Sequence, residues 1–278
     1  MLPRSHAARS GLVAVSLAAA LLGACSSGSR GPTAERDGPG DDRDLSQIPD
    51  AVPRVEPRSR GGNPDSYVVF GKRYYTLDSS LGYRKRGIAS WYGSKFHGRR
   101  TSNGEVYDMY AMTAAHKKLP LPTYAEVTNL ENGKRVIVRV NDRGPFHENR
   151  IIDLSYAAAN RIGMLSKGTA MVEVRAIDPR APSTTASANP APTASIGNAG
   201  QPRIFLQAGS FRSQANAERY RQRLQRDLDR EVRVMPFASD SGRVHRVQVG
   251  PMNSVELADK VASQMHDAGV LEPLVIID

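Results

Sequence analysis

The stretch YAEVTNLENGKRVIVRVN, residues 124–141, decides the fold class of the central part of this chain. It contains two short β-like runs, Tyr124–Asn129 and Arg135–Asn141. Asn132-Gly133 lies between them, and both residue types tolerate the positive φ angles of a tight turn. The stretch therefore predicts an antiparallel hairpin.

Further elements surround this hairpin along the chain. Gly87–Tyr92 and Gly168–Ile177 are β-like runs on either side of it. Asp153-Leu154-Ser155 followed by Tyr156–Ile162 predicts one capped helix, with Gly163 where a left-handed residue would end it. Many short strands with a single helix predict a small closed barrel.

The length and charge of the chain set broad limits on its organisation and partners. Its 278 residues are enough for two small domains with linkers. Of the net charge of +10, residues 67–178 contribute 18 Lys and Arg against 10 Asp and Glu, whereas residues 201–278 hold 11 against 10. The basic excess thus lies on the central domain. Such a surface attracts nucleic acid, anionic lipid or an acidic cell-wall polymer, and charge alone does not choose among them.

The first 24 residues predict an export signal. Arg4 and Arg9 precede the apolar run Gly11–Gly23, whose 13 residues are too few to span a bilayer but suit a signal peptide. The run ends in Leu22-Gly23-Ala24-Cys25, which resembles a bacterial lipobox and implies lipidation of Cys25, the single cysteine. An ordinary secretion signal beside a stray cysteine is the alternative. Both interpretations place the protein outside the cytoplasm.

Two stretches of biased composition separate the domains. Residues 25–66 are rich in Gly, Pro, Ser, Asp and Arg without apolar periodicity, and they predict a disordered tether. Residues 179–201 are rich in Ala, Pro, Ser and Thr and predict a flexible linker. The expected folded domains are therefore residues 67–178 and residues 202–278.

The last domain predicts a four-stranded sheet with two helices on one face. Ser213 and Ser254 are placed to cap two amphipathic helices. Strands are expected on both sides of these helices, which gives the order βαββαβ of ferredoxin-like and RNP-like domains. The four expected strands are Ile204–Gly209, Val232–Phe237, Val244–Val249 and Leu274–Ile277.

Several motifs together resemble one known family. The sequences Gly87–Gly93, Thr101–Glu105, Ala114–His116 and Val140–Phe146 resemble the rare lipoprotein A family of septal lytic transglycosylases. This resemblance implies that residues 67–178 form a double-psi β-barrel catalytic domain. In the last domain, Gln207–Phe211 and Val247–Pro251 resemble the sporulation-related repeat, or SPOR domain, which recognises septal peptidoglycan.

The resemblance also implies a catalytic set. Asp142 follows an apolar strand and becomes the expected acid and base, while Glu105 and His116 match the supporting pair. A lytic transglycosylase protonates the glycosidic oxygen and then closes a 1,6-anhydro ring on the muramoyl sugar, so it needs no water, cofactor or metal. The acid must be partly protonated near neutral pH, hence shielded from water. An Asx-turn or a surface Asp–Arg pair is the alternative for Asp142.

Alternation along the strands of the last domain separates two faces. Ile204, Leu206 and Ala208, with Val247 and Val249, are expected to meet the helices. The open face would then carry the candidate glycan-binding residues Phe205, Gln207, Arg246 and Gln248. Open sheets with aromatic side chains also bind RNA. Export and the near-neutral charge of this domain argue against nucleic acid, and a merely solvated face is the other alternative.

Three functions remain open at this stage. The first is a lytic transglycosylase acting on peptide-free peptidoglycan strands at the division septum, lipid-anchored through Cys25 on the periplasmic face of the outer membrane. The second is a non-catalytic, expansin-like peptidoglycan-binding protein. The third is a water-using glycosidase with Glu105 or Asp153 as the second carboxylate. A metal site is not expected, because His97 and His147 match no zinc spacing.

Overall fold

The computed structural model describes residues 38–41, 43–147, 149–181, 201–239 and 242–278. The predicted signal peptide, the predicted lipidation site Cys25 and most of the predicted linker lie outside these residues. Within the described part of the chain, no helix is long and apolar enough to cross a membrane.

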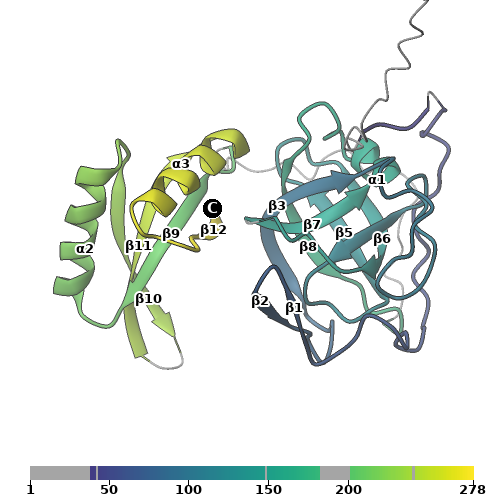
Figure 1. The fold of residues 1–278 in the computed structure, drawn as a ribbon, viewed down its shortest axis with the longest axis horizontal. Coiled ribbons are helices and arrows are strands. Elements are labelled where there is room, and N and C mark those ends of the chain that lie inside the picture. The colour runs from purple at the N-terminus through teal and green to yellow at the C-terminus, as the bar shows by residue number, and fades with distance from the viewer. Residues whose placement is uncertain (1–37, 42, 148, 182–200, 240–241) are drawn as a thin grey trace, which may run out of the picture. The chain divides into compact units, whose positions relative to one another are not determined.

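Six strands of the central domain close into a barrel in the order β3-β7-β4-β6-β5-β8 (Figure 1). The predicted hairpin is the antiparallel pair β5–β6, and Gly133 in its turn has a φ of 72°. Parallel pairs β3–β7 and β4–β6 join segments that are distant in sequence. The prediction of a small closed barrel is confirmed. Its strands are β3 (Arg84–Tyr92), β4 (Thr113–His116), β5 (Thr123–Asn129), β6 (Arg135–Asp142), β7 (Arg150–Ser155) and β8 (Ala170–Ala176).

The barrel interior is filled by the apolar residues that alternate along these strands. Fully buried members of this core include Ala89, Val127, Val138, Val140 and Leu154. Helix α1 (Tyr156–Arg161) packs Ala157–Ala159 against the same core and is capped by the Ser155 hydroxyl, which accepts from Ala158 N at 3.2 Å.

The predicted entry to this helix was partly wrong. Asp153-Leu154-Ser155 belongs to strand β7, where Asp153 pairs with Ser90 of β3 and Ala115 of β4. The capping Ser155 and the positive φ of Gly163 were predicted correctly. Asp153 and Leu154 adopt the strand conformation because β7 pairs with β3 on one side and with β4 on the other.

A second apolar cluster lies outside the barrel. Trp91 packs toward the barrel core, whereas the next residue, Tyr92, joins the outer cluster with Tyr107, Met109 and Ala115. Tyr92 stacks on Tyr107 with ring centroids 4.1 Å apart. The opposite orientations of Trp91 and Tyr92 confirm the alternation expected of a strand.

A separate hairpin precedes the barrel strands. It consists of β1 (Ser66–Val69) and β2 (Lys72–Tyr75). Tyr67 and Tyr74 stack at 5.4 Å, and Phe146, which follows the β6 segment, contacts both rings. The hairpin is thus anchored to the loop that follows Asp142.

The prediction of a disordered tether over residues 25–66 is wrong for residues 43–63, which we call the strap. These residues lie extended along the barrel, and Leu45 is buried there. Because β4 is short, it pairs with β6 only from Arg139 onward and leaves an open edge at Ile137. The strap fills that edge, since Ala51 N donates to Ile137 O at 3.0 Å and Asp50 accepts from Ile137 N at 3.2 Å.

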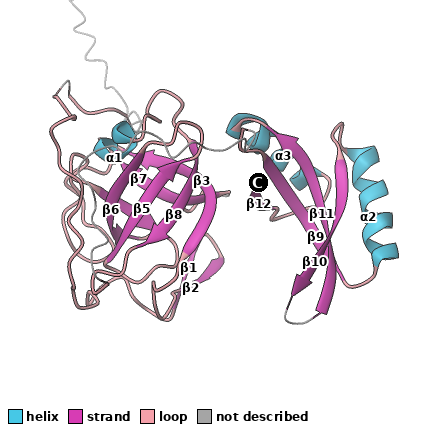
Figure 2. Ribbon diagram, turned by 180° about the vertical axis from the view of Figure 1, so that it is seen from behind, coloured by secondary structure: helices cyan, strands magenta, loops and turns pink. Residues whose placement is uncertain are grey.

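The last domain has the predicted βαββαβ order (Figure 2). Its sheet has the strand order β10-β11-β9-β12, and α2 (Gln214–Asp227) and α3 (Val255–Asp267) are capped by Ser213 and Ser254 as expected. Both helices share one core with Ile204 and Leu206. The ferredoxin-like prediction is confirmed. The strands are β9 (Ile204–Phe211), β10 (Val232–Ser239), β11 (Gly242–Met252) and β12 (Leu274–Ile277).

Candidate active site

Asp142 reaches the outer face of the barrel because of an irregularity in β6. Ala114 of β4 pairs with Val140, but the next residue, Ala115, pairs with Asp142, so Asn141 is an extra residue in the strand. Val140 points into the core, and regular alternation would turn Asp142 inward as well. The extra residue places Asp142 on the same outer face as Ala115. Such bulges often re-aim a side chain beside an active site.

Three donors converge on one oxygen of the Asp142 carboxylate. Its Oδ1 accepts from the Ser102 amide at 2.7 Å, the Ser102 hydroxyl at 2.5 Å and the Arg143 amide at 2.7 Å. The described residues donate no hydrogen bond to Oδ2. One oxygen is therefore fixed by the protein, whereas Oδ2 keeps its capacity to accept a proton or a hydrogen bond.

Glu105 lies in the same neighbourhood, held by the end of β6. Its carboxylate accepts from Arg139 Nη1 at 2.8 Å to each oxygen and from Asn141 Nδ2 at 2.9 Å. Burial acts to raise the pKa of Glu105, but the hydrogen bonds from Asn141 and Arg139 outweigh it and lower that pKa. Glu105 thus remains a carboxylate, linked to Asp142 through the adjacent Asn141.

His116 is not hydrogen-bonded to either of these carboxylates and has other partners among the described residues. Its Nδ1 accepts from the amides of Lys118 at 3.1 Å and Leu119 at 2.9 Å, so its proton is assigned to Nε2, 2.9 Å from the Tyr83 hydroxyl. His116 is 2% exposed. Burial, with the positive charges of Arg143 and two lysines, lowers its pKa to about 3. It is a neutral residue that holds the turn after β4.

This geometry predicts a structural effect of replacing His116. The folded-state pKa of about 3 lies below the unfolded value of about 6.5, so the stability that neutral His116 contributes is complete above pH 6.5 and is lost as the pH falls toward 3. His116→Ala leaves two amides unpaired and should cost about 3 kcal/mol at pH 7. Thermal unfolding from pH 3 to 8 measures both effects. Lost turnover at an unchanged thermal midpoint would instead indicate a catalytic role.

Asp153 is a second carboxyl on this face, near Asp142, and it was predicted from the sequence only as an alternative second carboxylate. It lies directly across Ala115 from Asp142, because Ala115 pairs with Asp142 on one side and with Asp153 on the other. Its Oδ1 accepts from the Ser90 hydroxyl at 2.5 Å. Burial raises the pKa of Asp153 above its usual value, although the Ser90 hydrogen bond opposes the shift. It therefore has the shielded environment that was expected of Asp142.

Tyr92 adds a buried hydroxyl to this neighbourhood. That hydroxyl has no well-formed hydrogen bond among the described residues, although the Thr113 side chain lies close enough to act on its pKa. Burial raises the pKa of Tyr92 well above 10, with further contributions from Tyr107, Asp142 and Asp153. Tyr92 is thus a neutral phenol near both aspartates.

In the last domain, the expected exposure of Phe205 is wrong. Phe205 is 1% exposed, and the Arg233 guanidinium lies 3.5 Å above its ring. Arg233 also donates to Gln248 Oε1 at 3.0 and 3.1 Å, which buries Gln248. Alternation identified the face of Phe205 correctly, but it did not reveal Arg233, which reaches Phe205 from β10, two strands away across β11.

The same sheet face offers another aromatic side chain instead. Phe237 is 40% exposed, and Arg246 stacks over it at 3.2 Å. Gln207 pairs with Gln248 in the register of β9 and β11. Arg246 and Gln207 are thus positioned on this face together with Phe237, a residue that sequence alternation alone did not favour over Phe205.

The described residues contain no group of three or more His, Cys, Asp or Glu side chains that would hold a metal ion. Each of the carboxylates above is instead held by side-chain or backbone donors from the protein.

Comparison with known proteins places this architecture in a family. The family model described as "Lytic transglycolase" matches residues 84–174, and the model described as "SPOR domain" matches residues 200–276. The protein named endolytic peptidoglycan transglycosylase RlpA from Pseudomonas aeruginosa (strain UCBPP-PA14) is 38% identical over 94% of this chain and 94% of its own length. This chain belongs to the RlpA family.

Other relatives agree with this placement. RlpA of Vibrio cholerae (strain ATCC 39315) is 43% identical over 90% of each chain, and RlpA of Helicobacter pylori (strain J99) is 58% identical over 39% of this chain and 34% of its own. Membership in the RlpA family confirms the resemblance found in the sequence. The chain is an enzyme with a double-psi lytic transglycosylase barrel and a SPOR domain.

Proposed function

We propose that this protein cleaves the bond between MurNAc and GlcNAc in peptidoglycan and leaves a 1,6-anhydroMurNAc end. The observation that carries the proposal is the pair Asp142 and Asp153, placed on either side of Ala115 on one barrel face. Their environments differ, since Asp142 is held by three donors whereas burial raises the pKa of Asp153. Two carboxyls in such different environments can divide acid and base work.

The roles follow from these environments. Asp153 donates its proton to the glycosidic oxygen, and the GlcNAc chain leaves as an alcohol. The C6 hydroxyl of the muramoyl residue attacks its own C1, and its proton passes to the free Oδ2 of Asp142. Proton exchange with solvent then restores both groups. Glu105 fixes the Asn141 side chain beside Asp142, and His116 supports the turn from the interior.

We also propose a preference for strands that have lost their stem peptides, whose charge suits the basic barrel region. Removing a peptide leaves a free lactyl carboxylate on each MurNAc, so the bare strand is a polyanion. The barrel region 67–178, with 18 basic against 10 acidic residues, attracts such a polymer. Digestion of matched peptide-free and peptide-bearing strands tests this. Faster cleavage of bare strands, weakened by added salt, supports the preference, and equal rates at every salt concentration contradict it.

The SPOR domain and the predicted lipid anchor supply the cellular position. We propose that the SPOR sheet face, with Gln207, Arg246, Gln248 and Phe237 and with Phe205 beneath Arg233, binds bare septal strands. Acylation of Cys25 would hold the protein on the periplasmic face of the outer membrane. The partners are therefore glycan strands and a membrane.

Deleting residues 201–278 should separate targeting from chemistry. The SPOR domain, through its linker, only raises the local concentration of the barrel near its substrate. The deletion should therefore abolish septal enrichment but leave kcat on soluble glycan within about two-fold. Fluorescence microscopy and product chromatography measure the two effects. Loss of cleavage by a folded barrel would contradict this division of labour.

Hydrolysis is a second candidate that one observation favours. Asp142 lies on β6 and Asp153 on β7, and β4 runs between these two strands. Two strand spacings therefore separate their Cα atoms, which is about 10 Å. Inverting glycosidases place two carboxyl groups roughly 6.5–9.5 Å apart around a water molecule, and side chains from two strands with a third between them can span such a distance. Product masses distinguish the candidates, because an anhydro end is lighter than a hydrolysed end by one water.

A further inference from the structure

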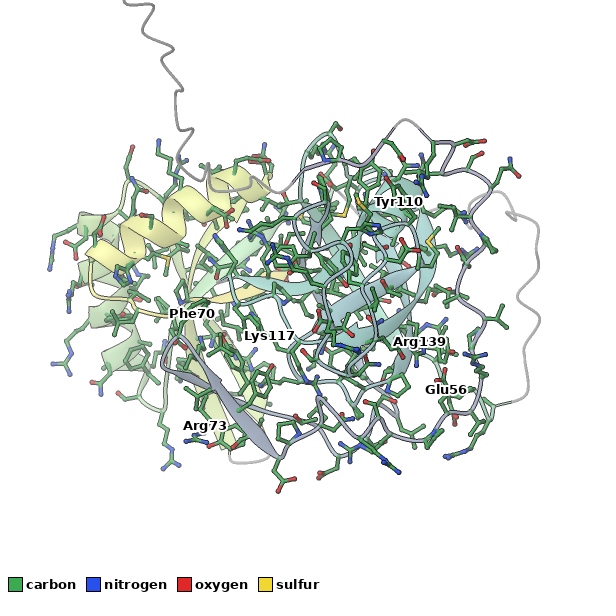
Figure 3. The ribbon with its side chains drawn as sticks, turned by 45° about the vertical axis from the view of Figure 1, so that its right-hand side comes forward. Glu56, Phe70, Arg73, Tyr110, Lys117 and Arg139 are labelled. Carbon is green, nitrogen blue, oxygen red and sulfur yellow. The ribbon has the colours of Figure 1, made fainter. Side chains whose placement is uncertain are left out.

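The strap, residues 43–63, touches the groups that hold both Asp142 and Glu105. It lies outside the residues matched by the lytic transglycosylase family model, which begin at residue 84. Figure 3 shows Glu56, on this extended segment, beside Arg139 of β6. Resting on the proposed function, we infer that the strap is a positioning element of the active site, with Glu56 and Gly61 as its key residues.

Glu56 fixes the arginine that holds Glu105. Arg139 donates from Nε to Glu56 at 3.0 Å and from Nη2 at 2.8 Å, a forked pair that sets the plane of the guanidinium. The remaining nitrogen, Nη1, is thereby aimed at both oxygens of Glu105. Tyr124 adds a 2.5 Å hydrogen bond to Glu56. The Arg139 hydrogen bond, supported by those from Tyr124 and Arg54, lowers the pKa of Glu56 to about 2 despite partial burial, so the fork stays charged.

The end of the strap contacts the two residues that donate hydrogen bonds to Asp142. Arg143 donates from Nε to Gly62 O at 2.8 Å, while its amide holds Asp142. On the other side, a Cβ atom at Gly61 would lie 3.0 Å from the carbonyl oxygen of Ser102. Gly61 thus packs directly against the residue whose amide and hydroxyl both bind Asp142.

These contacts make the strap a second layer behind the carboxylates. One residue separates the strap from each carboxylate. Arg139 lies between the strap and Glu105, and Arg143 and Ser102 lie between the strap and Asp142. A shift of a few tenths of an ångström in the strap would therefore move Glu105 or Asp142 without unfolding the barrel. Small misplacements of catalytic groups lower the rate more than they lower substrate binding.

Two variants of the full chain test this inference. Glu56→Gln keeps the size of the side chain but sets an amide nitrogen against an Arg139 N–H, and Gly61→Ala adds a methyl group against Ser102. Matched controls are Glu126→Gln, which loses an Arg175 pair elsewhere on the barrel, and Gly38→Ala, whose added Cβ would meet, among the described residues, only Ser94 Oγ at 3.7 Å. The measurements are kcat, KM, the thermal midpoint, and hydrogen exchange at the amides of Ser102 and Arg143.

The expected result is a loss of kcat on the order of ten-fold in each strap variant, with KM and the thermal midpoint close to those of the controls. Exchange at the Ser102 and Arg143 amides should also accelerate in these variants. Exchange and kcat equal to those of the controls would overturn the inference, as would a loss of kcat that merely follows the unfolded fraction. The exchange measurement needs no activity, so it remains decisive even if the wild-type protein cleaves no glycan and the proposed function fails.

Discussion

Replacing Asp142 with Asn should lower kcat on peptide-free glycan by about 10²–10⁴-fold. Asn retains an oxygen that accepts from Ser102 and Arg143, so the loop keeps its shape. What disappears is a carboxylate oxygen able to take the proton of the C6 hydroxyl. Initial rates on purified strands, with the thermal midpoint measured in parallel, give the result.

A matched control exists at the end of the barrel domain. Asp178 also accepts a backbone amide, from Arg180 at 3.0 Å, but it follows β8 and not β6 or β7, the strands that carry Asp142 and Asp153. Asp178→Asn should therefore change neither rate nor stability. If Asp142→Asn cleaves as fast as Asp178→Asn, Asp142 only shapes a turn, as the alternative interpretation of the sequence held.

Replacing Asp153 with Asn should also abolish most turnover, by a comparable factor, but for the opposite reason. The variant lacks the proton that the leaving GlcNAc oxygen requires. Since the acid must be protonated, wild-type kcat should fall as the pH rises through the raised pKa of Asp153. Ser90→Ala should move this alkaline limb to higher pH, because the Ser90 hydrogen bond lowers the pKa of Asp153. A limb that does not move would argue against Asp153 as the acid.

Asp153→Asn should also stabilise the protein at high pH. The folded-state pKa of Asp153 is raised above the unfolded value, so wild-type stability is complete below about pH 4 and declines as the pH rises through the folded pKa. Asp153→Asn lacks this decline. The gain in thermal midpoint over wild type should therefore be larger at pH 8 than at pH 4. Sites that trade stability for activity behave in this way.

Local sequence rules predicted the regular parts of this fold. The β5–β6 hairpin and the whole βαββαβ domain carry strong alternation, turn residues and caps, and all of them formed as predicted. The short strands β4 and β7 were missed, because four or six residues carry little periodicity and their partners are distant in sequence. The parallel pairs that close the barrel also leave no signal in any short stretch of sequence, because their strands are far apart along the chain.

The composition of the strap wrongly predicted disorder for this segment, which precedes the barrel. Residues 43–63 bury few apolar side chains and are held largely by backbone and charged contacts to β6 and to the loop around Leu121. Such contacts leave no apolar periodicity. The structure was needed to show that this Pro- and Gly-rich segment is ordered against the barrel.

The candidate site was only partly predictable for a related reason. Glu105 and Asp142 were identified through motifs, and the structure does bring them together. Asp153 was predicted only as an alternative second carboxylate of a glycosidase, because its position across Ala115 from Asp142 follows from the strand register alone. The role of His116 likewise depends on Tyr83, which lies 33 positions away.

The proposed reaction is tested most directly by cleaving peptide-free strands in water enriched in ¹⁸O and measuring the masses of the new muramoyl ends by mass spectrometry. If the sugar's own hydroxyl displaces the leaving group, each new end is one water lighter than a reducing end and carries no label from the solvent. New ends of full mass that contain ¹⁸O would contradict this mechanism and establish hydrolysis in its place.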